Sequence, residues 1–140
     1  MAFFNRILDS FRRGTDEAKV ICARYNRLHG FKASADTVAA FCAHSWGKYQ
    51  IMGYNLLKYG IMDEPIWRWI NSNELQEAAF DAFLTRIGLG GWGDRDYAGM
   101  IGEEKRTFAR KYNGPGNVEE YVARMDKAYK EIMSTTKVRR

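Results

Sequence analysis

Residues 45–55 read Ser45-Trp46-Gly47-Lys48-Tyr49-Gln50-Ile51-Met52-Gly53-Tyr54-Asn55, and this stretch indicates the fold more strongly than any other. It places rings and side-chain amides between and beside two glycines. Gly47 and Gly53 have no Cβ, which lets the backbone turn tightly and approach other groups closely. The amides of Gln50 and Asn55 offer both donors and acceptors. Apolar walls with a few well-placed polar groups are typical of ligand sites, so we predict a sugar-binding turn here.

Two motifs of the chain resemble those of one known family. The pattern S-W-G-x-x-Q-I-M-G-x-N over residues 45–55 resembles the core motif of the phage-type N-acetylmuramidases, distant relatives of goose-type lysozymes and lytic transglycosylases. The segment Phe108-Ala109-Arg110-Lys111-Tyr112-Asn113-Gly114 resembles the F-A-x-x-Y-N-G segment of that family. Both occur in the family's order, over roughly the last two thirds of the chain. The resemblance implies a lysozyme-like helical fold and a saccharide cleft lined by Ser45, Trp46, Gln50, Met52, Tyr112 and Asn113.

The N-terminal region does not match the family where its catalytic glutamate should lie, at the end of a helix before the SWG turn. At that helix end this chain has Tyr25 and Asn26, and neither can act as a carboxylic acid. Glu17 is the only glutamate before the turn and is therefore the candidate acid. We expect it in the first turn of a helix, where free N–H groups and the helix dipole favour the ionised carboxylate. A glycosidase acid must instead hold its proton near neutral pH.

Apolar residues recur at helical spacing almost throughout, which predicts an all-α or α-dominated fold. At most a small β-hairpin is expected, at Tyr49 to Met52. A length of 140 residues suits one domain over 1–140, with 1–13 as a short amphipathic and basic helix. Cap and breaker residues predict helices at about 15–29, from 34, 54–59, 66–70, 74–87, 103–112 and 118–133.

Composition limits the classes of partner. The chain has 22 Lys and Arg against 17 Asp and Glu, a net charge of +5, which favours anionic partners. The basic residues are scattered and no nucleic-acid-binding signature is present, which disfavours nucleic acid. No apolar run is long enough for a transmembrane segment, and no signal peptide is recognised. Cys22 and Cys42 lack metal-ligand spacing, so we expect free thiols and neither metal nor cofactor.

These observations predict a domain that binds peptidoglycan glycan strands and, if an acid is in place, cleaves them as a glycoside hydrolase of the muramidase type. The open alternative is a catalytically inactive lysozyme-like scaffold that serves as a structural or interaction protein of a virion. In that case the Phe4–Phe11 helix would dock a phage protein partner. The expected location is the host cytoplasm or the virion, with action at the bacterial cell wall.

Overall fold

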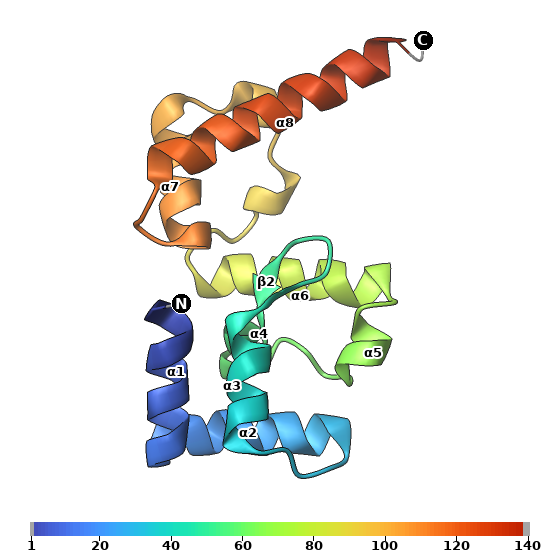
Figure 1. The fold of residues 1–140 in the computed structure, drawn as a ribbon. Helices are drawn as coiled ribbons and strands as arrows, with labels where there is room; N and C mark the ends of the chain where they lie inside the picture. The colour runs from blue at the N-terminus through green and yellow to red at the C-terminus, as the bar shows by residue number, and fades with distance from the viewer. Residues whose placement is uncertain (1, 139–140) are drawn as a thin grey trace. The chain divides into compact units, whose positions relative to one another are not determined.

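The computed structural model describes residues 2–138, and it consists of helices with one small antiparallel hairpin (Figure 1). The predicted α-dominated fold is confirmed. The chain divides into two compact units, with the boundary between Phe83 and Leu84. The first unit contains α1 (Ala2–Arg13), α2 (Asp16–His29), α3 (Ala35–Ala43), β1 (Ser45–Trp46), β2 (Ile51–Met52), α4 (Gly53–Lys58), α5 (Ile66–Trp69) and most of α6 (Asn73–Arg86).

The helix boundaries of the first unit follow from local cap chemistry, as predicted. The Thr15 hydroxyl accepts a hydrogen bond from the Ala18 N–H at 3.2 Å and so begins α2. Gly30 ends that helix with φ of 74°, a left-handed conformation that glycine adopts without strain. Ser34 caps α3 in the same way as Thr15 caps α2. These residues set where the helices start and stop through hydrogen bonds within a few residues of each helix end.

The core of the first unit lies between α1, α2, α3 and α4. Figure 1 shows α1 beside α3, and α3 and α2 both pack against α4. Ile7 and Phe11 of α1 are buried, so the apolar face predicted to dock a partner is used at least partly inside this unit. Among the most buried side chains of the core are Ile21, Val38, Cys42, Ile51, Leu56 and Leu57.

The hairpin occupies a wider stretch than predicted. Ser45 pairs with Met52 and Trp46 pairs with Ile51, whereas the sequence suggested only Tyr49 to Met52. The reason lies in the backbone, because Gly47 (φ 77°) and Gln50 (φ 52°) both have positive φ and close a turn over 47–50. The Gln50 N–H donates to the Gly47 carbonyl at 3.2 Å across this turn. Tyr49 and Gln50 therefore belong to the turn and the first strand precedes it.

The second unit contains η1 (Trp92–Asp94), η2 (Tyr97–Gly99), α7 (Gly102–Asn113) and α8 (Val118–Val138), and α7 packs against α8. Asp126 of α8 holds the loop before α7 in place. It accepts hydrogen bonds from the Tyr97 hydroxyl at 2.5 Å and from Lys105 Nζ at 2.9 Å. These bonds lower the pKa of Asp126, the one from Tyr97 most. Within residues 2–138, no helix has the length and apolarity needed to cross a bilayer.

Candidate functional site

The turn of the hairpin rests on a buried glutamine that the sequence analysis did not single out. Gln76 of α6 is only 4% exposed. Its Oε1 accepts a hydrogen bond from the Lys48 N–H at 2.8 Å, and its Nε2 donates to the Ile70 carbonyl at 3.0 Å. The same amide therefore joins the hairpin turn to the end of α5. A signal existed in the sequence, since Gln76 shares helical spacing with the buried residues Ala79 and Phe83.

The two glycines of the motif make the close approaches that their lack of a Cβ predicts. A Cβ on Gly47 would lie 2.5 Å from Gln76 Oε1 and 3.0 Å from the Trp69 ring. A Cβ on Gly53 would lie 2.2 Å from the Phe41 carbonyl oxygen. Gly47 thus lets the turn sit on α6, and Gly53 lets the start of α4 sit on α3.

Three of the predicted binding residues lie together on the hairpin. Ser45 and Met52 are cross-strand partners, and the Ser45 hydroxyl donates to Met52 Sδ at 3.2 Å. Ser45 and Gln50 are exposed, Met52 is half-buried, and Ile51 between them is buried in the core. Gln50 Nε2 donates to the Gly47 carbonyl at 2.8 Å, so its amide nitrogen serves the turn while the side chain remains exposed. We call the exposed surface of Ser45, Gln50 and Met52 the hairpin face.

Trp46, a fourth predicted binding residue, has a clear structural role. Its indole N–H donates to the Phe41 carbonyl at 3.0 Å, and its ring stacks on the Phe41 ring with centroids 5.0 Å apart. The side chain is half-buried. Trp46 therefore fastens β1 to α3, and removing its ring would disturb the fold as well as any ligand contact.

Glu17, the candidate acid, lies in the first turn of α2, as predicted. The residue is exposed, and its carboxylate accepts a hydrogen bond from the Tyr54 hydroxyl of α4. Burial, and next this hydrogen bond, raise the pKa of Tyr54, which keeps the phenol protonated as the donor. Phe3 packs edge-on against the Tyr54 ring, with centroids 5.7 Å apart. Glu17 is thus an acceptor that links α2 to α4.

The other two predicted binding residues belong to the second unit. The Tyr112 ring stacks on Phe108 with centroids 5.2 Å apart, and Phe108 stacks in turn on Trp92. Asn113 is the exposed last residue of α7. The hairpin residues and the Tyr112–Asn113 pair lie in different units, and a single cleft formed by both sets stays a prediction.

The described residues offer no group of three or more His, Cys, Asp or Glu side chains that could hold a metal ion. Both histidines have structural partners. His29 Nδ1 bonds to the Tyr25 carbonyl and its Nε2 accepts from the Ile66 N–H, while His44 Nδ1 bonds to the Ala40 carbonyl. Burial is the main cause that raises the pKa of Cys42 to about 12, so this residue is a thiol at neutral pH.

Comparison with known protein families gives a match. A family model described as N-acetylmuramidase matches residues 5–133. The searches of curated proteins and of solved structures gave no match. The match includes both motifs, the hairpin with its supporting helices, and α7. It also extends over α1 from residue 5 and over α2 with Glu17, so the expectation that the N-terminal region lies outside the family is wrong.

Proposed function

Because the chain belongs to the N-acetylmuramidase family, we propose that it binds peptidoglycan glycan strands on the hairpin face. Family membership supports a lysozyme-like function that acts on peptidoglycan. The observation that carries the proposal for this face is that the hairpin is held at both ends. The Gln76 side chain of α6 accepts a hydrogen bond from its turn, and Gly53, directly after β2, packs closely against α3. A surface held in one conformation loses little entropy when it binds a ligand.

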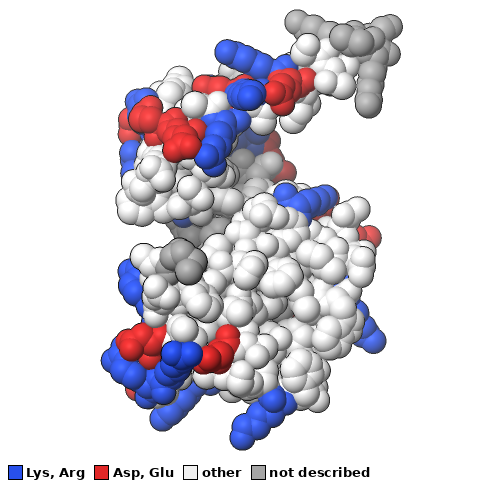
Figure 2. Space-filling view, in the orientation of Figure 1, with Lys and Arg blue, Asp and Glu red and all other residues white. Residues whose placement is uncertain are grey.

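The chemistry of the hairpin face suits a sugar. The Ser45 hydroxyl and the Gln50 amide can exchange hydrogen bonds with sugar hydroxyl and acetamido groups. Met52 beside them adds apolar, polarisable surface. Figure 2 shows the face of the first unit on which α3 lies. This face is largely uncharged, and Lys and Arg side chains lie mainly at its edges. An uncharged surface suits the hydroxyl and acetamido groups of sugar rings, which are themselves uncharged.

Cleavage would need an acid, and the surroundings of Glu17 argue against that role for this residue. A general acid keeps its proton until it protonates the leaving oxygen. Glu17 instead accepts a hydrogen bond from the Tyr54 hydroxyl and lies where the helix dipole favours a negative charge. We therefore assign Glu17 a structural role in holding α2 to α4.

The position of Glu17 favours a second candidate function, that of a phage-encoded lysozyme-like scaffold that binds glycan without cutting it. In this version the protein is a structural or interaction component of a virion that acts at the bacterial cell wall. Its partner would contact those parts of α1 that remain accessible, around the half-buried Phe4. Both versions share the hairpin face as the glycan-binding surface and differ in whether wall material is cleaved.

The experiment that tests the proposal is co-sedimentation with purified glycan strands from which the peptides have been removed. Ser45→Gln places a longer neutral side chain on the hairpin face without entering the core. We expect this variant to lose most of the binding of the unaltered chain. Ala23→Gln, at an exposed position on α2, is the matched control and should bind normally. Equal binding by the two variants would contradict a role for the hairpin face.

A further inference from the structure

The first unit has a cavity of about 160 Å³ between the second half of α2 and the segment that follows α4. We propose that this cavity binds the peptide stem of peptidoglycan by its free carboxylate, with an amine of the same peptide on the opposite side. The inference rests on the proposed function, since it names the second part of the same polymer. It assigns the peptide to a site separate from the residues of the hairpin face.

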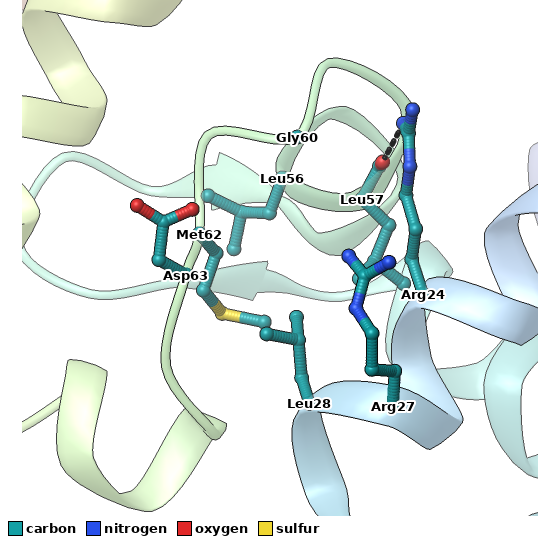
Figure 3. A pocket seen from close by; sticks show the side chains of 8 residues that line it. All are labelled: Arg24, Arg27, Leu28, Leu56, Leu57, Gly60, Met62 and Asp63. Carbon is teal, nitrogen blue, oxygen red and sulfur yellow. Dashed lines mark hydrogen bonds between the residues drawn. The ribbon is translucent and has the colours of Figure 1, made fainter.

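The charges around the cavity have the required arrangement. Figure 3 shows Arg24 and Arg27 on one side and Asp63 on the other. Arg24 Nη1 donates to the Leu57 and Lys58 carbonyls, each at 2.7 Å, which fixes its guanidinium at the end of α4. A guanidinium has five N–H donors, so the remaining ones can serve a ligand. Arg24 is held in place before any ligand arrives.

Arg27 and Asp63 differ from most charged residues of this unit. Both are exposed, and within the described residues no hydrogen bond or ion pair engages either side chain. By contrast, the exposed Arg12 and Asp36 pair with each other at 2.8 Å. Two unpaired charges of opposite sign across one small cavity can each take a ligand group of the opposite charge. A carboxylate suits a guanidinium group because it can accept two of its hydrogen bonds together.

The size and floor of the cavity select the kind of ligand. Leu56 and Met62 are buried and Leu28 is half-buried, which gives an apolar surface between the charged groups. The volume is close to that of a cavity known to hold benzene, about 150 Å³, and lies below the roughly 300 Å³ at which drug-sized pockets begin. It can enclose the carboxylate-bearing end of a short peptide, with the rest of the peptide extending along its open side, and it is too small to enclose a disaccharide. The alanine end of a peptide stem has this size and charge.

Other ligand classes fit the cavity less well. A phosphate or a nucleic-acid backbone would bring concentrated negative charge towards Asp63. A neutral saccharide would leave two guanidinium groups without a charged partner. A short peptide with one carboxylate and one amine satisfies both signs of charge together and places small side chains on the apolar floor.

The test is isothermal titration of the full chain with the tripeptide Nα-acetyl-L-Lys-D-Ala-D-Ala, whose lysine amine is free. We expect binding that falls about tenfold or more for Arg27→Gln, because a hydrogen bond to a charged group is lost. Asp63→Asn should weaken the tripeptide and leave unchanged the analogue whose lysine is acetylated. Lys32→Gln removes the same charge outside the cavity and is the matched control. The tripeptide with a C-terminal amide should bind as weakly to the unaltered chain as the acid does to Arg27→Gln.

Two results would overturn the inference: no heat of binding for the tripeptide at millimolar concentration, or equal affinity for its acid and amide forms. Binding to peptide-free glycan strands, measured in parallel, distinguishes failure of the cavity assignment from failure of the proposed function. Arg27→Gln should bind those strands normally, whereas Ser45→Gln should not. Tripeptide binding without glycan binding would contradict the hairpin proposal and leave the cavity assignment supported.

Discussion

Replacing Gly53 with alanine should disturb the hairpin more than a methyl group added at any other position of its motif. The new Cβ would lie 2.2 Å from the Phe41 carbonyl oxygen, about 1.2 Å short of the 3.4 Å at which ordinary contact begins. Backbone cannot yield as a flexible side chain can. The Phe41 oxygen also accepts the Trp46 indole N–H at 3.0 Å, and the Gly53 N–H donates to the His44 carbonyl at 2.8 Å. Displacement of α4 therefore threatens two hydrogen bonds.

The magnitude follows from these contacts. Overpacking a tight site costs about 1–3 kcal/mol, and a lost hydrogen bond adds about 0.5–1.5 kcal/mol. We expect Gly53→Ala to lower the free energy of unfolding by about 2–4 kcal/mol, measured by urea denaturation followed by circular dichroism. Gly116→Ala, where a Cβ would meet nothing within 4 Å and φ is not positive, should stay within about 0.5 kcal/mol of the unaltered chain. Equal stability of the two variants would refute the close-approach argument.

Three further predictions concern polar residues. Glu17→Gln should lower the free energy of unfolding by about 0.3–1 kcal/mol and leave unchanged any clearing of purified peptidoglycan suspensions; clearing that vanishes in the variant would make Glu17 the acid. Gln76→Leu keeps similar bulk but strands the Lys48 N–H and the Ile70 carbonyl, so urea denaturation should show a loss of about 1–3 kcal/mol, and unchanged stability would argue against the anchor. Asp126→Asn should lower the free energy of unfolding at pH 7. Because the pKa of Asp126 is lowered in the folded state, the difference in free energy of unfolding between variant and unaltered chain should shrink as the pH falls below about 4. A difference that does not change with pH would contradict this.

The sequence predicts the helices well because their signals are local. Thr15 and Ser34 lie within a few residues of the N–H groups that they cap, and Gly30 follows directly the helix that it ends. The glycines of the motif could also be interpreted from the sequence, since only a residue without a Cβ tolerates close approach of other atoms to its backbone. The hairpin could not be placed as precisely, because the positive φ of Gln50 has no marker in its residue type.

Contacts between distant residues account for what the sequence did not reveal. The bond from Lys48 to Gln76 spans 28 residues, and that from Tyr54 to Glu17 spans 37. Nothing in the spacing of Glu17 identifies Tyr54 as its partner, although the cap residues placed Glu17 in the first turn of its helix. The cavity beside Arg27 likewise depends on the meeting of α2 with the segment after α4.

The central claim, that the hairpin face binds glycan strands, is tested most directly by nuclear magnetic resonance. A ¹⁵N-labelled chain would be titrated with peptide-free glycan strands while amide chemical shifts are recorded. We predict that, within the first unit, the largest shifts fall on residues 45–53 and that amides along α2 remain unchanged. Binding that leaves residues 45–53 unshifted, or no shift at all at saturating glycan, would contradict the account.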